Sequence, residues 1–376
     1  MKINIITCHD VYNYGASLQA YALSTYLMAI GHEVEIIDYK PDYLSHHYEF
    51  GYVDERNKYY QLCKKSKIFH FVYSLRLVPV TFATWRRIKP FSRFKKERLK
   101  CSKRYSNLKS LQLDPPNGDL YIAGSDQIWN CNLPNGKDAA FFLSFGTPKR
   151  KVSYAASFAM SSIPNEYKEM LKSYLANIDS ISVREESAVS LLANIGYKSK
   201  AVIDPVYLLK KELWNDFAGN VRIIKEQYVL VYNLNHNNTS AIKTEAIRVA
   251  KKHGCIIVAI DSSFKCKFSK RNIHDAGPVE FVNLIKNASY VVTDSFHGMS
   301  FALIMQKPFS VWHKHSDSSR IYDLLSDIGV TSCINNSIIE NNFNWSIISK
   351  KIKQKVDDSI TFLQSNINIL NQSKLK

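Results

Sequence analysis

The stretch Thr293-Asp-Ser-Phe-His-Gly298 contains a histidine, His297, whose side chain could transfer protons. Residues 290–292 form a short apolar β-rich run, which predicts a strand, and Gly298 precedes an apolar helical pattern over 299–305. His297 is therefore expected at the carboxyl end of a strand and beside a helix N-terminus, where open α/β sheets bind anions. An imidazole exchanges protons near neutral pH, so His297 is a candidate general acid or base. A lone histidine in a turn is more often structural, so the other residues must show whether His297 has a chemical role.

Other polar side chains follow other predicted strands. Arg184 comes after the predicted strand 178–183, and a guanidinium there suits an anionic ligand, although arginine at a strand end is often a surface ion-pair partner. Asp126 follows a strand predicted over 119–124 and fits either a sugar hydroxyl or a helix N-cap. The loop 8–16 is a candidate ligand loop, although Asn-Tyr-Gly is also ordinary turn chemistry. The candidate acceptor-binding residues are Asn13, Tyr14, Gly15, Ser125 and Asp126.

No metal site is predicted. The seven cysteines are scattered and never spaced as CxxC, which argues against structural zinc and indicates a reducing compartment. The pairs His46/His47 and His313/His315 have no carboxylate or cysteine at ligand spacing, so we interpret them as surface histidines. No DxD pair offers a seat for a metal-bound nucleotide sugar.

The predicted elements form two α/β halves. Residues 2–38 read as strand, loop, helix and strand, with Gly31 ending the helix, a Rossmann-like unit that lacks both GxGxxG and a Walker A lysine. The same alternation restarts after Pro205. We therefore expect two Rossmann-like doubly wound domains, 1–205 and 206–343, that face a central cleft, the layout of GT-B glycosyltransferases. A helix within 344–376 carries one apolar face and is expected to run back across both domains.

Residues 42–113 interrupt this alternation as a basic, aromatic, helical insertion of the first domain. Residues 51–110 hold 17 Lys/Arg and three acids, which accounts for most of the net charge of +17. Amphipathic helices of this composition suit an anionic membrane surface or a phosphorylated lipid carrier. A solvated basic insertion is an equal alternative. No nucleic-acid-binding motif is present, so a nucleic acid partner is not predicted.

The N-terminus has no apolar signal-peptide region, and no run approaches the roughly 18 apolar residues of a transmembrane helix. The expected location is cytoplasmic, with peripheral contact at the inner face of the membrane through the insertion. The sequence predicts no oligomeric state.

Five motifs in order resemble the polysaccharide pyruvyl transferase family. They are Asn13-Tyr-Gly-Ala-Ser-Leu-Gln-Ala-Tyr-Ala-Leu23, Gly124-Ser-Asp-Gln-Ile-Trp-Asn130, Ser182-Val-Arg-Glu-Glu-Ser187, Asp204-Pro205 and Thr293-Asp-Ser-Phe-His-Gly298. The resemblance implies a GT-B-like fold and transfer of a pyruvyl group from phosphoenolpyruvate onto two hydroxyls of a sugar. The product is a cyclic ketal on a surface or capsular polysaccharide or its lipid-linked oligosaccharide precursor, and no metal or cofactor is required.

The resemblance also implies roles for individual residues. His297 matches the proposed catalytic histidine and Arg184 the proposed phosphoenolpyruvate ligand, with the first domain on the acceptor side and the second on the donor side. A second arginine stands two positions before the histidine in a similar family member, and here that position is Ser295. Arg320 is the candidate replacement. The expected donor-binding residues are Arg184, Ser295, Phe296, Gly298 and Arg320.

Two other functions compete with this one. The first is a GT-B glycosyltransferase that uses a nucleotide sugar. The second is a non-catalytic basic protein that binds membranes or nucleic acid through residues 56–109.

Overall fold

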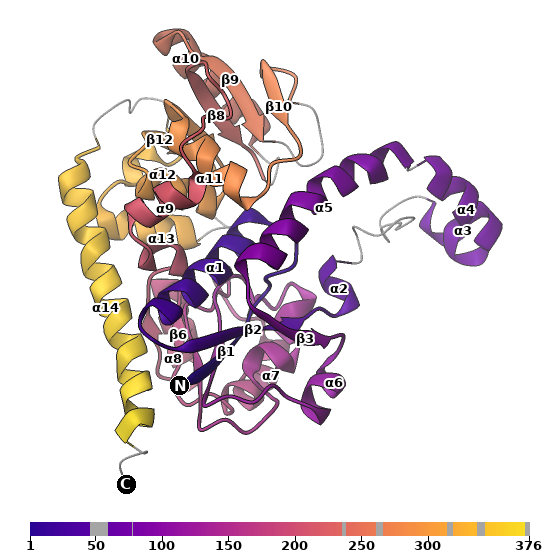
Figure 1. The fold of residues 1–376 in the computed structure, drawn as a ribbon, viewed down its shortest axis with the longest axis vertical. Coiled ribbons are helices and arrows are strands. Elements are labelled where there is room, and N and C mark those ends of the chain that lie inside the picture. The colour runs from indigo at the N-terminus through magenta and orange to yellow at the C-terminus, as the bar shows by residue number, and fades with distance from the viewer. Residues whose placement is uncertain are drawn as a thin grey trace.

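The computed structural model contains two five-stranded parallel β-sheets, one in each half of the chain (Figure 1). Each sheet has its first strand at the centre, so that the strand order reverses there, as in doubly wound folds. The fold class predicted from the sequence is confirmed. The structure describes residues 1–45, 59–76, 78–234, 238–260, 266–313, 319–336 and 343–372.

The first sheet has the order β3-β2-β1-β4-β5. Its central strand β1 buries Ile3, Ile5 and Ile6 completely, together with the polar Asn4, so the strand is covered on both faces. The candidate residues Gly15, Ser125 and Arg184 follow the carboxyl ends of β1, β4 and the short strand β6, respectively. The strands are β1 (Lys2–Ile6), β2 (Glu33–Tyr39), β3 (Cys101–Tyr105), β4 (Leu120–Ala123) and β5 (Arg150–Ser153), with a two-stranded pair β6 (Ser182–Val183) and β7 (Lys200–Ala201) beside them.

The second sheet repeats this arrangement in the order β10-β9-β8-β11-β12. Its central strand β8 is buried throughout, and β11 beside it leads directly to the histidine motif. The strands are β8 (Tyr228–Tyr232), β9 (Ile256–Ile260), β10 (Arg271–Ile273), β11 (Tyr290–Thr293) and β12 (Phe309–Val311).

Helices cover the sheets and connect their strands. In the first half they are α1 (Tyr14–Ala29), α2 (Asp42–Ser45), α3 (Tyr60–Lys65), α4 (Lys67–Arg76), α5 (Val78–Arg98), α6 (Leu108–Leu113), α7 (Asn165–Leu175) and α8 (Glu186–Ala193). In the second half they are α9 (Lys211–Ala218), α10 (Thr239–His253), α11 (Pro278–Asn287), α12 (Phe296–Ile304), α13 (Ser319–Ile328) and α14 (Trp345–Gln372). Short 3-10 helices are η2 (Pro134–Lys137), η3 (Ala139–Phe142), η4 (Pro205–Leu208) and η5 (Thr331–Cys333).

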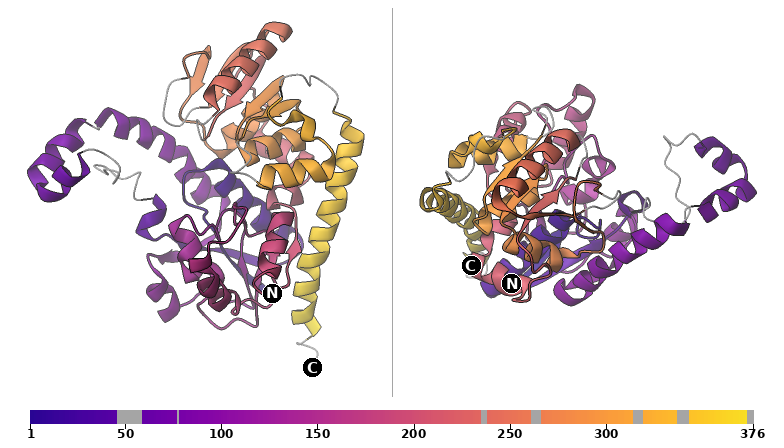
Figure 2. Two further views of the ribbon diagram at one scale, coloured as in Figure 1. Left: turned by 180° about the vertical axis from the view of Figure 1, so that it is seen from behind. Right: turned by 90° about the horizontal axis from the view of Figure 1, so that it is seen from above.

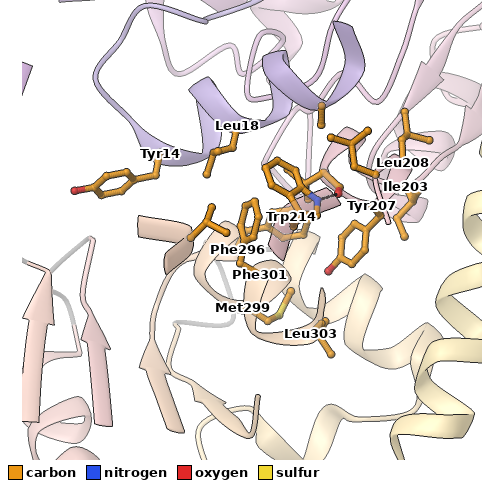
Figure 3. Packing of buried hydrophobic residues seen from close by; sticks show 14 of the residues in the cluster. Tyr14, Leu18, Ile203, Tyr207, Leu208, Trp214, Phe296, Met299, Phe301 and Leu303 are labelled. Atoms are coloured by element: carbon orange, nitrogen blue, oxygen red, sulfur yellow. Dashed lines mark hydrogen bonds between the residues drawn. The ribbon is translucent and has the colours of Figure 1, made fainter. Parts of the chain in front are cut away.

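Helix α1 packs against the second half as well as the first. The ring of Tyr14 stacks on Phe281 of α11 with ring centroids 4.4 Å apart, and its hydroxyl donates to the carbonyl of Ala276 at 3.0 Å. Figure 3 shows Tyr14 and Leu18 of α1 in the same apolar cluster as Phe296 of α12. One hydrophobic core therefore continues from one half to the other.

Helix α14 also contacts both halves. Arg150 of β5 donates to Asn366 of α14, and Gln306, just after α12, donates to Ser349 near the other end of the helix. Its apolar face contributes Leu363 and Ile367 to the shared core. The long yellow helix runs alongside both sheets in Figures 1 and 2. The domain limits 1–205, 206–343 and 344–376 stay predictions.

The predicted insertion 42–113 is only partly an insertion. Helices α3 and α4 and the outer part of α5 project from the body of the molecule as an arm (Figures 1 and 2). Cys101–Tyr105, however, is β3, the edge strand of the first sheet, so a helical assignment of this segment is wrong. The strand reads Cys-Ser-Lys-Arg-Tyr because an edge strand exposes much of its surface and needs no apolar run. Residues 46–58 and 77 lie outside the described residues.

Two helices begin earlier than the sequence pattern indicated. The side chain of Asn13 accepts a hydrogen bond from the Ala16 amide, so α1 starts at Tyr14 rather than at Ser17. The hydroxyl of Ser295 accepts from the Gly298 amide, so α12 starts at Phe296. In both cases the cap residue lies before the first apolar residue of the pattern, so the helix begins there. His297 therefore lies inside the first turn of α12.

Candidate active site

His297 belongs to the first turn of α12 and is buried against the first turn of α1. Its Nε2 atom is 3.5 Å from Oδ2 of Asp204, and only 8% of the side chain is exposed. Nε2 makes no hydrogen bond with any residue in the described ranges. The imidazole is therefore held near a carboxylate and keeps an unused nitrogen.

Gly15 allows this position. A Cβ atom placed on Gly15 would lie 1.9 Å from Nδ1 of His297, which no side chain can accommodate. The glycine brings α1 of the first half against the histidine of the second half. The structure places Gly15 in the first turn of α1, against His297, and its predicted role in ligand binding stays a prediction.

Asp204 joins the candidate residues of both halves. Its Oδ1 atom caps η4 by accepting from the Val206 amide, while Oδ2 accepts from Arg184 at 2.6 Å and from the Ser125 hydroxyl at 3.1 Å. Burial by itself would raise the pKa of Asp204, but the charges of His297 and Arg184, together with hydrogen bonding, outweigh it and hold the pKa well below its usual value. Asp204 is therefore an anion at neutral pH.

Two guanidinium groups flank the ring of Phe296. The guanidinium carbon lies 4.6 Å from the ring centroid for Arg184 and 5.8 Å for Arg320. Burial and repulsion by Arg184 lower the pKa of Arg320 to about 10, so that both groups remain charged at neutral pH. A cationic pair around one aromatic ring is an arrangement that attracts an anion.

These guanidinium groups are incompletely paired. Nε and Nη2 of Arg184 and Nε of Arg320 are buried without a hydrogen-bond partner among the described residues. Arg184 has Asp204 as its ion-pair partner, whereas no ion pair to Arg320 is found in the part of the chain that the structure describes. Buried donors of this kind are normally satisfied, so the unpaired ones fit a site that receives an anionic ligand.

A pocket opens beside these residues, between the two halves and α14. Its walls include Arg184 and Asp204 from the first half, Phe296 and Arg320 from the second, and Ser359 from α14. His297 does not line this pocket.

Across the described ranges, no three His, Cys, Asp or Glu side chains are placed to hold a metal ion; His46, His47 and His315 lie outside them. His313 is buried rather than on the surface as predicted, and its backbone amide and carbonyl both pair with the side chain of Asn335.

The remaining predicted residues have structural positions. Asn13 and Ser295 cap helices, and Tyr14 packs between the halves. Gly298 lies so close to Thr293 that a Cβ atom would be 2.6 Å from its hydroxyl oxygen. Asp126 has a φ of 80°, and its carbonyl accepts from Ser157. The sequence-derived roles of these residues in ligand binding stay predictions.

Asp204 is the main site residue that the predicted set lacked. An Asp-Pro pair after a strand was visible in the sequence, but nothing local says that its carboxylate faces Arg184 and His297. Glu185 was missed too. It is 1% exposed, one oxygen contacts the Ser157 hydroxyl, and the other has no partner in the described residues.

Structural comparison defines the class of protein first. UDP-GlcNAc 2-epimerase of Methanocaldococcus jannaschii, in complex with UDP-GlcNAc and UDP, superposes with a TM-score of 0.50 at 13% identity, over 95% of this chain and 93% of that chain. The Staphylococcus aureus MnaA–UDP structure gives 0.49 at 13% identity, over 95% and 88% of the two chains. Escherichia coli heptosyltransferase WaaC with ADP gives 0.42 at 12% identity, over 96% and 99%. The first of these superpositions and the two parallel sheets show that the protein has a GT-B-like fold.

The sequence then identifies the family. The family model described as polysaccharide pyruvyl transferase matches residues 13–311, and the chain belongs to this family. Comparison with curated proteins finds no matching sequence. Family membership makes the protein a transferase, which sets aside the interpretation as a non-catalytic binding protein.

Proposed function

We propose that this enzyme transfers a pyruvyl group from phosphoenolpyruvate to two hydroxyls of one sugar in a surface or capsular polysaccharide or its lipid-linked precursor. The observation that carries the proposal is the pair of guanidiniums around Phe296, since Arg320 lacks an ion-pair partner in the described chain. Phosphoenolpyruvate has a phosphate and a carboxylate, and two guanidiniums can bind both groups by charge-assisted hydrogen bonds. No metal or other cofactor takes part in this proposal.

The proposed reaction needs one acid. His297, as imidazolium, protonates the methylene carbon of phosphoenolpyruvate while the first sugar hydroxyl attacks the adjacent carbon and gives its proton to the vacated imidazole. Phosphate then leaves with cleavage of its bond to that carbon. The second hydroxyl attacks the same carbon, and its proton departs with the phosphate. The products are a cyclic ketal and inorganic phosphate, and every proton is accounted for.

The arrangement around Asp204 suits these steps. His297 lies 3.5 Å from Asp204, and its Nε2 atom has no hydrogen-bond partner among the described residues, so this nitrogen is left for a substrate. Asp204 remains ionised and holds Arg184 in place. Ser125 supports the same carboxylate at 3.1 Å. Asp204 thus acts as a positioning residue in this proposal.

A donor-competition experiment tests the proposal. The enzyme is incubated with phosphoenolpyruvate or with a panel of nucleotide sugars, in each case with oligosaccharide acceptors, and the product is analysed by mass spectrometry and for released phosphate. A ketal-linked pyruvyl group and an equal amount of phosphate are expected. Consumption of a nucleotide sugar with transfer of its sugar would instead establish the glycosyltransferase alternative.

A further inference from the structure

Helix α4, in the arm, exposes an apolar stripe that the packing of the described residues does not explain. Ile68, Phe71, Val72 and Leu75 recur at steps of three and four residues, which places them on one face of the helix. Their exposed fractions are 79%, 63%, 53% and 51%. Burying a side chain of this size stabilises by roughly 1.5–3 kcal/mol, so four exposed neighbours are a large unused apolar surface.

The opposite face of α4 already has its partners. Phe69 and Tyr73 stack with ring centroids 6.4 Å apart, and Tyr59 contacts them at 6.2 Å and 5.5 Å. Ser74 is buried on this side. Because these contacts attach α4 to the rest of the arm, the exposed stripe is the outward face of a helix that is packed on its inner face.

Positive charge precedes the stripe along the chain. Lys64, Lys65 and Lys67 are exposed next to it, and residues 59–76 contain four Lys/Arg and no Asp or Glu. A helix with an apolar face and flanking lysines is typical of segments that lie in the interface of an anionic membrane, where each lysine contributes about 1 kcal/mol. A protein partner would have to supply a complementary groove, whereas an anionic bilayer offers both required chemistries at once.

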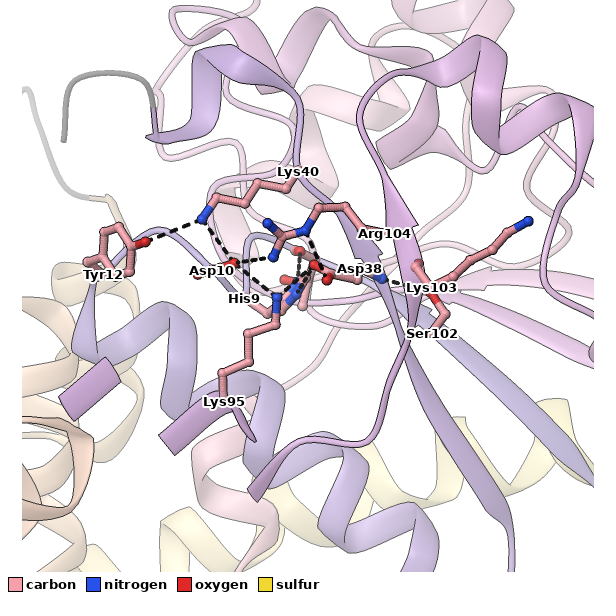
Figure 4. A network of polar contacts seen from close by, with 10 residues as sticks. His9, Asp10, Tyr12, Asp38, Lys40, Lys95, Ser102, Lys103 and Arg104 are labelled. Carbon is pink, nitrogen blue, oxygen red and sulfur yellow. Dashed lines mark hydrogen bonds and ion pairs between the residues drawn. The ribbon is translucent and has the colours of Figure 1, made fainter. Parts of the chain in front are cut away.

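The base of the arm is anchored to the body of the enzyme. Lys95 of α5 forms ion pairs with Asp10 at 3.0 Å and with Asp38 at 2.8 Å (Figure 4). Phe91 and Phe94 of the same helix belong to the core shared by both halves. The arm projects away from that core in every view (Figures 1 and 2), so its tip can reach a surface that the globular body does not touch. In the described part of the chain, no helix is both long and apolar enough to cross a bilayer.

We propose that the arm docks the enzyme on an anionic membrane by inserting the α4 stripe into the interfacial region while Lys64, Lys65 and Lys67 face the headgroups. The inference goes beyond the proposed chemistry and does not depend on it. Because Lys95 of α5 pairs with Asp10 in the loop after β1, docking of the tip would hold the first half of the molecule near the membrane surface.

Vesicle flotation of the full chain tests the proposal, with phosphatidylcholine vesicles and with vesicles that also contain phosphatidylglycerol. We expect binding to the anionic vesicles, weakened by salt. The stripe variant Ile68→Ser/Phe71→Ser/Val72→Ser/Leu75→Ser should bind at least about tenfold more weakly, because each truncated side chain loses apolar burial. The basic variant Lys64→Gln/Lys65→Gln/Lys67→Gln should lose its preference for anionic vesicles.

A matched control removes exposed apolar side chains elsewhere. Val221 and Ile347 are 84% and 53% exposed and lie outside the arm, so Val221→Ser/Ile347→Ser should leave vesicle binding unchanged. Equal binding by wild type and stripe variant, or no preference for anionic vesicles, overturns the proposal. It is also overturned if the stripe variant changes only the molar mass in light scattering, because the stripe would then join two copies. Neither substrate is present, so failure here is distinct from failure of the proposed pyruvyl transfer.

Discussion

Two charged clusters of similar composition differ in how completely their polar atoms are paired. The anchor cluster, at the carboxyl edge of the first sheet (Figure 4), consists of His9, Asp10, Asp38, Lys40, Lys95 and Arg104. The site cluster consists of Arg184, Asp204, His297 and Arg320. Each contains an aspartate, a histidine and an arginine, so composition does not distinguish them.

Pairing does distinguish them. In the anchor cluster, His9 contacts Asp38 at 3.3 Å through Nε2 and the Thr7 carbonyl at 3.2 Å through Nδ1. Arg104 contacts Asp38 and Asp10 through two nitrogens. In the site cluster, nitrogens of His297, Arg184 and Arg320 have no hydrogen-bond partner among the described residues. A closed network stabilises the fold, whereas an open one pays for unpaired donors unless a ligand completes it.

The histidines should show the largest difference. His297→Gln is expected to lower turnover by about 10²–10⁴-fold, because it removes the acid while nearly keeping the shape. His9→Gln should leave turnover within a few-fold and cost about 1 kcal/mol of stability, because it weakens one part of a closed network. Phosphate release and urea unfolding measure the two effects. Intact turnover of phosphoenolpyruvate in the His297 variant would refute its role as the acid.

The arginines should differ in both binding and stability. Arg320→Gln is expected to raise KM for phosphoenolpyruvate by about 10–100-fold through loss of charge-assisted hydrogen bonds. It should not destabilise the free enzyme, because it removes a buried cation that repels Arg184. Arg104→Gln should lower stability and leave KM unchanged. A normal KM in the Arg320 variant would show that another residue takes the second anionic group.

Gly15 links α1 to the site cluster. Gly15→Ala is expected to displace His297 and cost about 1–3 kcal/mol of stability, although alanine is the better helix former. In a His297→Ala background the steric conflict disappears, so the stability cost of Gly15→Ala should vanish. Unfolding of the two single variants and the double variant measures this coupling. Additive effects would mean that the two residues do not press on each other.

The smallest expected effect is the pH dependence of the anchor cluster. Burial alone would raise the pKa of Asp38, but hydrogen bonds and charges from His9 and Lys95 hold it below its usual value. Since the folded-state pKa is depressed, Asp38 stabilises the protein above its unfolded pKa of about 4, and this contribution is lost as pH falls toward the folded pKa. Asp38→Asn should therefore cost about 1–2 kcal/mol near pH 7 and less in acid.

Unfolding by urea at about pH 7 and at about pH 3 provides the measurement, with the unfolding free energy of wild type and variant compared at each pH. A difference that stays the same at both pH values would mean that the Asp38 carboxylate contributes nothing through its charge.

The central strands were predictable, whereas two of the four edge strands were not. β8 and β11 are apolar runs because they are buried on both faces, and such runs are visible in the sequence. β3 and β10 read Cys-Ser-Lys-Arg-Tyr and Arg-Asn-Ile, and both lie at sheet edges. Pairing with one neighbour and contact with solvent suffice for an edge strand, so these two strands carry no apolar pattern.

The sequence by itself determined the two parallel sheets, the family motifs and the position of His297 at a strand end, because apolar periodicity and capping are local properties. Only the tertiary structure decided that Asp204 lies between Arg184 and His297, that Arg320 flanks Phe296, and that Gly15 rests on the histidine. These contacts join residues from both halves of the chain. Their geometry depends on how α1, α12 and α13 pack across a shared core, which no local pattern specifies.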